Sequence, residues 1–322
     1  MSAQSRGVVV DAAMPEVTPR YVKSQLPRLR EGGHQAVLVT AASIQSPAEA
    51  VLAVGEWWQA HHDPDQPARV ATSVAEIREI VESGDLAIVL HFQGMEPIGG
   101  RIEMLDAYHR LGVRVMQFTY NYSSVLGDGC LEERNGGLTA LGRKALKRMH
   151  ALGIAPDLTH AGERTCLDVL SLAERPVVAT HSNAKAICDS PRNLSDEVID
   201  GIARTGGVIG VVAFPAFVAA TDPTLDKLIN HVVHIAERIG PEHVGIGTDF
   251  ADEDEEDFDF YGYDPRYYPR PPWTWPAGIA WWEDVRNIPE ALAARGFSET
   301  EITGIMGENF LRVFDELWTP GA

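Results

Sequence analysis

Short apolar runs alternate along the chain with longer segments in which apolar residues recur at helical spacing. A short apolar run bounded by polar or turn residues indicates a buried strand, whereas apolar residues at positions i, i+3, i+4 and i+7 indicate an amphipathic helix. The pattern predicts eight strands, at residues 7–11, 36–40, 86–92, 113–119, 154–158, 177–180, 208–213 and 244–248. Strands that alternate with helices are typical of βα units around a parallel sheet. We therefore expect an α/β fold, a (β/α)8 TIM-like barrel.

Helical spacing is clearest in three segments between these strands, at residues 101–111, 138–152 and 225–239. Two further helices are expected after the last strand, at residues 288–295 and 298–318. No repeat of fixed period and no low-complexity linker divides the sequence. We expect residues 1–322 to form a single barrel domain, with C-terminal helices over residues 288–318.

The alternation stops after residue 248. Residues 251–259 are almost all acidic, which is typical of a solvated loop, and residues 261–276 are rich in Tyr, Trp and Pro. Proline excludes regular structure, and aromatic side chains supply contact area. We expect an ordered acidic and aromatic loop over residues 251–287. Two placements are open for it, a flap over the barrel mouth or a subunit contact of a homodimer.

Composition narrows the class of partner. The formal net charge of -19 argues against nucleic acid and anionic membranes, since both attract Lys and Arg. The three cysteines lack the spacing of a disulfide framework or a metal site, which fits a reducing cytoplasm. No apolar run approaches the roughly 20 residues of a membrane span. We expect a cytoplasmic protein that acts on a small molecule.

Two of the predicted strands end at a histidine. Residues 154–158 lead into Thr159-His160, and residues 177–180 lead into His181. Functional residues of α/β barrels sit at the C-terminal ends of the strands, and imidazole is the commonest metal ligand. A lone histidine here would more often cap hydrogen bonds, but two such units about twenty residues apart favour a metal site.

Nine short motifs run through nearly the whole chain, at residues 112–121, 127–129, 137–139, 157–160, 180–183, 192–193, 206–210, 243–249 and 307–312. Their order and spacing resemble those of the membrane dipeptidase (renal dipeptidase, M19) family of metallopeptidases. The resemblance implies a barrel of the metallo-dependent hydrolase type with two metal ions at its strand ends. It also implies a dipeptide, or a similar small amide, as substrate.

The resemblance assigns roles to several residues of this chain. His160 and His181 match the two histidines that hold the family's second metal ion. Asp249 matches the aspartate that contacts the first metal ion and handles the proton. Arg192 matches the arginine that pairs with the substrate carboxylate, a task that suits the fixed donor fork of a guanidinium.

The chain also departs from the family pattern. The family opens with Asp-Gly-His-x-Asp, whose histidine and second aspartate bind the first metal ion, but residues 11–15 read Asp-Ala-Ala-Met-Pro. Gln93 stands where the family has a bridging glutamate, and a neutral amide is a poor bridge between two cations. Glu96 lies three residues further on. Tyr120 replaces a histidine that touches substrate, so Tyr120 and its neighbour Asn121 are candidate substrate-binding residues.

These departures predict one metal ion, most simply zinc, with His160, His181, Gln93 and Asp249 as candidate ligands and Asp249 as the catalytic base. Other histidines are weaker candidates. His61 and His62 stand at the end of a predicted helix and are expected to be solvated. His91 lies within a predicted strand, where its side chain can face either the barrel interior or a helix. Alternative functions are a pathway-specific lyase or isomerase on the same barrel, and a non-catalytic binding homologue.

Overall fold

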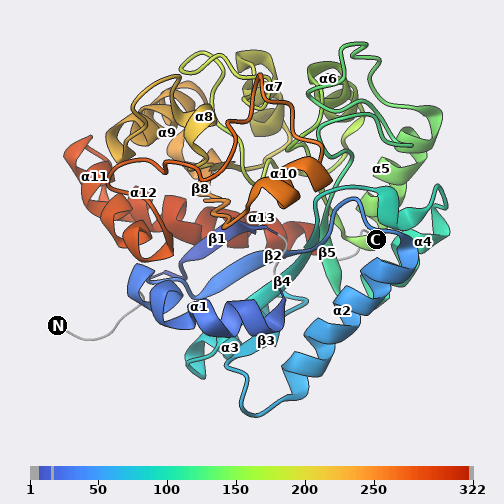
Figure 1. The fold of residues 1–322 in the computed structure, drawn as a ribbon, viewed down its shortest axis with the longest axis horizontal. Coiled ribbons are helices and arrows are strands. Elements are labelled where there is room, and N and C mark those ends of the chain that lie inside the picture. The colour runs from blue at the N-terminus through green and yellow to red at the C-terminus, as the bar shows by residue number, and fades with distance from the viewer. Residues whose placement is uncertain (1–6, 16–17, 319–322) are drawn as a thin grey trace.

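Parallel strands curl into a barrel-like wall with helices packed outside it (Figure 1). The structure is a computed structural model and describes residues 7–15 and 18–318. Its main sheet has the order β1 (Val10–Met14), β2 (Ala36–Ala42), β4 (Leu86–Phe92), β5 (Val113–Gln117) and β6 (Ala155–Asp157), with β3 (Ala68–Val70) also paired to β4. A second sheet pairs β7 (Ile209–Val211) with β8 (Val244–Ile246). All these pairings are parallel, as βα units require.

Isolated bridges join the two sheets where residues 177–180 were predicted to form a strand. Asp157 bridges to Val178, and Ala179 bridges to Ile209, both in parallel. The segment is not a regular strand because the N–H of Thr180 donates to the side chain of Asp157 (3.0 Å) instead of to a strand backbone. On the other side, the N–H of Asp249 donates to the carbonyl of Ala13 (3.0 Å) and links the end of β8 to β1. The predicted TIM-like α/β fold is confirmed, with β3 as a strand that the pattern missed.

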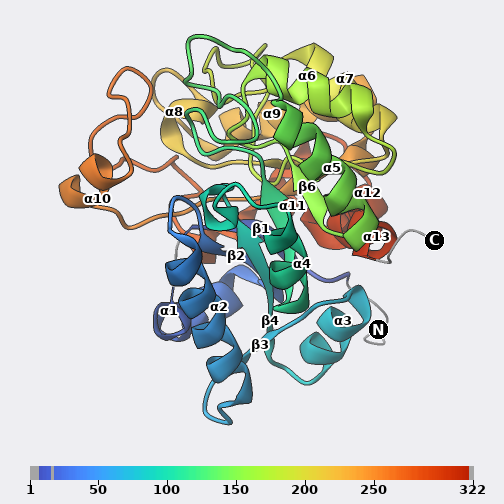
Figure 2. The same cartoon turned by 90° about the vertical axis from the view of Figure 1, so that its right-hand side faces the viewer.

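The helices between the strands cover the outer face of this wall (Figure 2). They are α1 (Pro19–Gly32), α2 (Pro47–His62), α3 (Val74–Glu82), η1 (Glu96–Ile98), α4 (Glu103–Arg110), α5 (Ala140–Leu152), α6 (Glu163–Leu172), α7 (Asp196–Arg204), α8 (Pro215–Val218), α9 (Leu225–Ile239) and η2 (Pro241–His243). Helix α5 shows how local sequence sets the ends. The side chain of Thr139 accepts from the N–H of Gly142, and Gly153 ends the helix at φ 79°.

The segment after β8 differs from the predicted loop at one point. The acidic run contains a short helix, α10 (Glu255–Phe260), because Asp254 and Asp257 form a capping box at its start. The predicted helix 298–318 consists of α12 (Glu299–Thr303), a π-helical turn η4 (Gly304–Glu308) and α13 (Asn309–Trp318), preceded by η3 (Trp282–Asn287) and α11 (Ile288–Ala294). Within the described ranges, no helix is long and apolar enough to cross a membrane.

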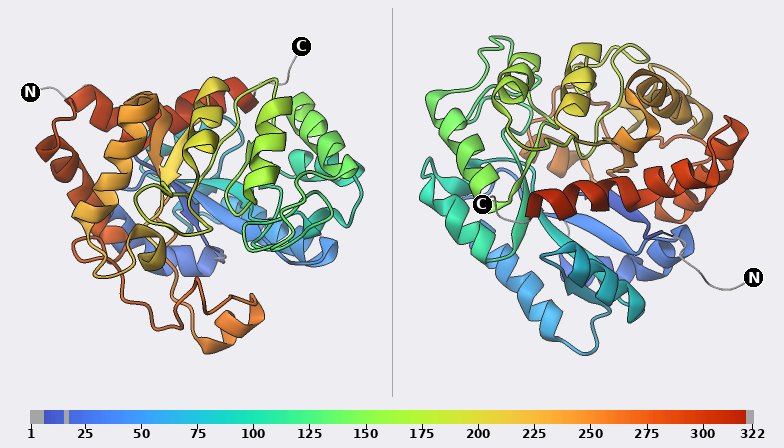
Figure 3. Two further views of the ribbon diagram at one scale, coloured as in Figure 1. Left: turned by 90° about the horizontal axis from the view of Figure 1, so that it is seen from above. Right: turned by 180° about the vertical axis from the view of Figure 1, so that it is seen from behind.

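Helix α13 packs across the end of the barrel where the strands begin (Figure 3). Its Phe310 and Phe314 belong to one buried cluster with strand residues two positions apart, including Val10, Leu38 and Val89. Side chains at alternate strand positions share a face, so this cluster is the inward face of the wall. The barrel therefore has an apolar base that α13 closes. The residues with candidate chemistry lie at the opposite, C-terminal ends of the strands.

Candidate active site

His160 and His181 converge at the C-terminal rim of the barrel, as predicted. His160 follows β6 with a left-handed backbone (φ 66°), and His181 follows the bridged segment 177–180. Both side chains are buried, and their Nε2 atoms are 3.2 Å apart. Burial, followed by the nearby positive charge of Arg192, lowers the pKa of both imidazoles well below the usual value. Both rings are therefore neutral, the form that binds a metal ion.

Each imidazole has its second nitrogen engaged by a fixed partner. Nδ1 of His160 lies 2.8 Å from Oδ1 of Asn121, which also accepts from the hydroxyl of Tyr268 (3.0 Å). Nδ1 of His181 lies 2.9 Å from Oγ1 of Thr180. Partners of this kind fix the ring orientation. The two Nε2 atoms consequently face each other in the site.

Arg192 is buried beside His160. Its Nε donates to the hydroxyl of Tyr268 (3.1 Å), its Nη2 lies 3.3 Å from Nε2 of His160, and its guanidinium lies over the ring of Phe217 (5.0 Å to the centroid). Its Nη1 has no hydrogen-bond partner among the residues that the structure describes. A buried charged donor without an acceptor is costly, so this nitrogen is free to bind an anionic ligand.

Asp249 lies directly beyond β8 with a left-handed backbone (φ 57°). Burial raises the pKa of its carboxyl to about 7, while Arg192 acts in the opposite direction. Gln93, the residue in place of the family's glutamate, lines the same cavity as Asp249 and acts with Arg192 to lower this pKa. A carboxyl that titrates near neutral pH can both take up and release a proton at working pH.

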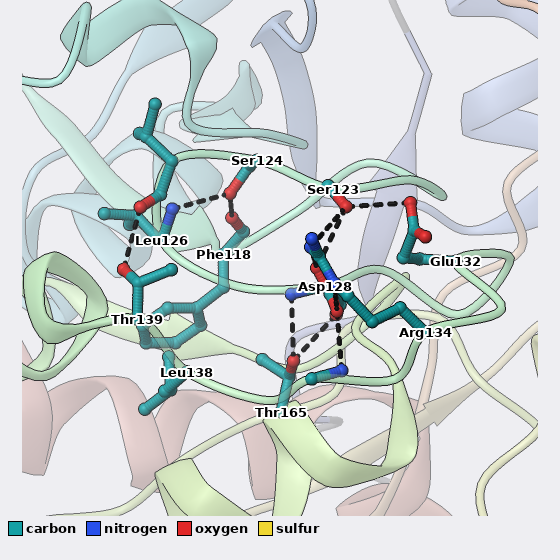
Figure 4. Close-up of polar contacts among 12 residues, drawn as sticks. Phe118, Ser123, Ser124, Leu126, Asp128, Glu132, Arg134, Leu138, Thr139 and Thr165 are labelled. Atoms are coloured by element: carbon teal, nitrogen blue, oxygen red, sulfur yellow. Dashed lines mark hydrogen bonds and ion pairs between the residues drawn. The ribbon is translucent and has the colours of Figure 1, made fainter.

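The loop between β5 and α5, which carries Asn121, is folded around Asp128 (Figure 4). The carboxylate of Asp128 accepts from the hydroxyl of Ser123 (2.9 Å) and pairs with Arg134. Its backbone exchanges two hydrogen bonds with the hydroxyl of Thr165 on α6, at 3.2 Å and 2.7 Å. Asn121 itself has a left-handed backbone (φ 58°). The loop is thus anchored internally and to the next helix, which holds Asn121 against His160.

Tyrosines of the 251–287 segment line the cavity at the barrel mouth, which agrees with a flap over the mouth. The ring of Tyr120 stacks on His160 (4.5 Å between centroids), and its hydroxyl lies 2.9 Å from that of Tyr263. Tyr263 stacks in turn on Tyr268 (4.6 Å). The cavity that these residues share with Gln93, Arg192 and Asp249 has a volume of about 30 Å³, room for about one water molecule.

The remaining candidates lie outside this cavity. His91 is buried inside the barrel with Nε2 3.2 Å from Oδ2 of Asp157, below the rim. His61 and His62 end α2, where Nδ1 of His61 accepts from the N–H of Val70 (3.0 Å). Glu96 is in η1 and is not among the residues that line the cavity. Sequence reasoning missed the contact of Tyr268 with Arg192, for which the aromatic density of residues 261–276 was the only signal.

The residues of this chain lack the donors of the family's first metal site. The family's first site would require donors where Ala13 and Pro15 stand, of which Ala13 is fully buried. The carboxylate of Asp11 is engaged by Thr248 (2.5 Å) and His34 (3.2 Å). No group of three His, Cys, Asp or Glu side chains within residues 7–15 and 18–318 could hold an ion.

The two imidazoles fit a shared ion by distance. Two nitrogens bound to one tetrahedral zinc at about 2.0–2.1 Å are about 3.3 Å apart, and the Nε2 atoms of His160 and His181 are 3.2 Å apart. Further ligands would be oxygens of Gln93, Asp249, water or substrate. A bound ion would stand beside the positive charge of Arg192, which lowers its affinity.

Comparison with known proteins gives a consistent result. A family model described as membrane dipeptidase (peptidase family M19) matches residues 14–259. Dipeptidase tcpJ of Claviceps purpurea is 28% identical over 256 residues, which are 77% of this chain and 55% of the relative. Dipeptidase verJ of Clonostachys rogersoniana is 30% identical over 253 residues, 77% of this chain and 60% of the relative. The chain thus spans little more than half the length of these two fungal relatives.

Solved structures extend the similarity to almost the full chain. An amidohydrolase from Pseudomonas aeruginosa superposes with a TM-score of 0.88 at 29% identity, covering 97% of both chains. A metallopeptidase from Rhodobacter sphaeroides, liganded with a phosphinate mimic of the dipeptide L-Ala-D-Ala, has a TM-score of 0.81 at 22% identity and covers 97% of this chain and 100% of its own. The second likeness supports the fold alone.

Proposed function

The chain belongs to the membrane dipeptidase family, peptidase family M19, and from that premise we propose that it is a metal-dependent hydrolase of a dipeptide or a similar small amide with a free carboxylate. One observation carries the proposal. The buried guanidinium of Arg192 has no partner for Nη1 among the described residues. It lies beside two neutral imidazoles whose Nε2 atoms are 3.2 Å apart. This combination offers a carboxylate-binding donor next to a site for hydrolytic chemistry.

His160 and His181 would hold the ion, which we propose to be a single zinc. Gln93 and Asp249 line the cavity together with His160 and are the proposed oxygen donors from the protein. Zinc, when bound, supplies Lewis acidity and lowers the pKa of a bound water. Asn121 and Thr180 hold the two imidazoles in the orientation that ligation needs.

Asp249 is the proposed proton carrier. Because its pKa is raised to about 7, it is partly ionised at neutral pH and can accept a proton from the attacking water. The protonated carboxyl can then deliver that proton to the leaving amine. Arg192 would bind the substrate carboxylate and so fix the scissile amide relative to Asp249.

Tyr120 and Asn121 are the proposed walls of the substrate pocket. Nδ2 of Asn121 is buried and has no partner within the described part of the chain, so it is available to a substrate oxygen. Tyr120 places a phenol where the family has a histidine, and its stacking on His160 narrows the cavity. We therefore expect a narrower substrate range than that of a general dipeptidase.

A second candidate is a lyase or isomerase on the same barrel. The observation in its favour is that Ala13, Pro15 and Gln93 stand where the family has donors of its first metal site. Such a catalyst would use Asp249 for proton transfer without hydrolysis. A non-catalytic binding homologue would retain the cavity but turn over no substrate.

Metal analysis combined with a dipeptide panel separates these functions. Protein purified without chelator should contain about one equivalent of zinc and should hydrolyse a few members of the panel. Two equivalents would contradict the single-ion site. Zinc-loaded protein that hydrolyses no dipeptide would shift support to the lyase or isomerase.

A further inference from the structure

A layer of polar side chains lies inside the barrel directly below the two histidines. We call His91, Gln117, Asp157 and Thr180 the polar layer. Each stands two positions after a residue of the apolar base, namely Val89, Val115, Ala155 and Val178, and so shares its inward direction. All four are fully buried. Buried polar groups need satisfied hydrogen bonds, so this layer has a cost that calls for a role.

Asp157 is the acceptor at the centre of the polar layer. Its Oδ1 accepts from the N–H groups of Thr159 (2.9 Å) and Thr180 (3.0 Å). Its Oδ2 accepts from Nε2 of Gln117 (3.1 Å) and from the hydroxyl of Thr180 (2.5 Å), and lies 3.2 Å from Nε2 of His91. Burial alone would raise the pKa of this carboxyl, but its contacts, led by the side chain of His91, lower it well below the usual value. Asp157 is therefore an ionised group that only accepts.

Thr180 links this carboxylate to the site. A hydroxyl has one hydrogen, and that of Thr180 points at Oδ2 of Asp157. Towards Nδ1 of His181, 2.9 Å away, the Thr180 oxygen can then only accept. Nδ1 must carry the hydrogen, and Nε2 must carry the lone pair. The partner of His160 exerts weaker control, because an amide such as that of Asn121 can present either its oxygen or its nitrogen.

We propose that Thr180 is a positioning residue that, by donating its hydrogen to Asp157, holds His181 in the Nδ1–H form with the Nε2 lone pair directed at His160. The catalytic meaning of this role rests on the proposed function, since a lone pair on Nε2 is what a zinc ion or a transferred proton requires. The arrangement itself depends only on the polar layer.

Histidine tautomers are read from two-bond ¹H–¹⁵N spectra of protein labelled in histidine, with His181 assigned by comparison with His181→Asn. Spectra are taken of the protein as purified and after dialysis against EDTA. In both, we expect a protonated Nδ1 and an unprotonated Nε2 for His181. A protonated Nε2 in the dialysed wild type would overturn the proposal without any variant.

Two variants separate positioning from packing. Thr180→Val keeps the shape and removes the hydroxyl, so the dialysed variant should show His181 with the hydrogen shifted wholly or partly to Nε2. Thr180→Ser keeps the hydroxyl and should retain the wild-type tautomer. Zinc affinity, measured by competition with a chelating dye, should fall about tenfold to a hundredfold in Thr180→Val and stay within about threefold in Thr180→Ser.

The outcomes distinguish this inference from the proposed function. An unchanged tautomer in a folded Thr180→Val protein would contradict the positioning role even if zinc binds and dipeptides are cleaved. Conversely, a wild type that binds no zinc but shows the expected tautomers would refute the single-zinc site and leave the role of Thr180 intact.

Discussion

The hydroxyl of Tyr268 accepts a hydrogen bond from Nε of Arg192 at 3.1 Å, which ties the aromatic segment after β8 to the barrel rim. The same hydroxyl donates to Oδ1 of Asn121 (3.0 Å), the atom that also contacts His160. One phenol therefore connects the proposed carboxylate-binding arginine with the support of a proposed metal ligand. The segment over the mouth is part of the site and not only its cover.

Replacing Tyr268 by Phe should destabilise the protein by about 1–3 kcal/mol, because a buried charged donor, Nε of Arg192, loses its acceptor while the ring packing is retained. Urea unfolding measures the change. Tyr267→Phe, in the half-buried neighbour, should stay within about 0.5 kcal/mol. Equal stability of wild type and Tyr268→Phe would mean that the contact contributes nothing.

Replacing either His160 or His181 by Ala should remove bound zinc, because one imidazole with the oxygens of Gln93 and Asp249 holds the ion too weakly. Elemental analysis of folded protein gives the metal content, and activity should be lost with the metal. His62→Ala, at the exposed end of α2, is the matched control and should keep both. Full zinc occupancy in the His160 or His181 variant would show that the ligands are elsewhere.

Changing Gln93 to Glu should raise zinc affinity, since a carboxylate adds charge to a cavity that already contains Arg192. The zinc content of protein dialysed against a weak chelator checks this prediction. Gln59→Glu makes the same change of charge on the exposed face of α2 and should leave the metal content unchanged. A lower zinc content in Gln93→Glu would count against Gln93 as a neighbour of the ion.

Arg192→Lys should lower kcat/KM about tenfold or more, because a point charge cannot reproduce the two parallel hydrogen bonds of a guanidinium with a carboxylate. Arg110→Lys, on the exposed face of α4, should have no effect. The difference between wild type and Arg192→Lys should shrink for C-terminally amidated substrates. An equal loss with amidated and free substrates would show that Arg192 does not bind the carboxylate.

The pKa of Asp249, raised to about 7 by burial, predicts two pH effects. Between about pH 4 and pH 7, the native state keeps the proton on Asp249, whereas the unfolded chain, with an aspartate pKa near 3.9, has released it. The contribution of Asp249 to stability is therefore fully present below about pH 4 and is lost as the pH rises through about 7, by on the order of 4 kcal/mol.

The free energies of unfolding of wild type and Asp249→Asn, both measured in EDTA between pH 4 and 8, isolate the effect of Asp249 on stability. The stability of wild type relative to the variant should fall as the pH rises. As proton acceptor, Asp249 should also make kcat/KM rise with pH through about 7, and Asp249→Asn should be inactive. A flat stability difference between pH 4 and 8 would contradict the raised pKa.

The rim of the barrel was largely predictable from sequence. A strand that ends in a polar residue places that residue at the rim, and so His160 and His181 could be identified from the pattern. Asp249 was identified from the family resemblance. The segment 177–180 could not be recognised as irregular, because its apolar pattern is that of a strand. In place of a backbone hydrogen bond to a neighbouring strand, the N–H of Thr180 donates to the side chain of Asp157.

Contacts across the mouth were beyond sequence reasoning. Tyr268 meets Arg192 across 76 positions of the chain, and nothing in residues 261–276 distinguishes the tyrosine that turns inward from its neighbours. The polar layer was hidden for a related reason. Its members are single polar residues within or beside apolar runs, and only the barrel brings them together.

The apolar base under α13 joins distant parts of the chain. The N–H of Val8 donates to Oε1 of Glu308 (2.9 Å), 300 positions away, and Val10 packs in the same cluster as Phe310. Residues this far apart in the sequence can meet only after a long loop closes. The chain entropy lost in that closure precedes any stabilisation by the contact, and this slows folding. We expect the strands to assemble first and the docking of α13 to limit the rate of refolding. Until it docks, the inward apolar faces stay open to water and to other unfolded chains.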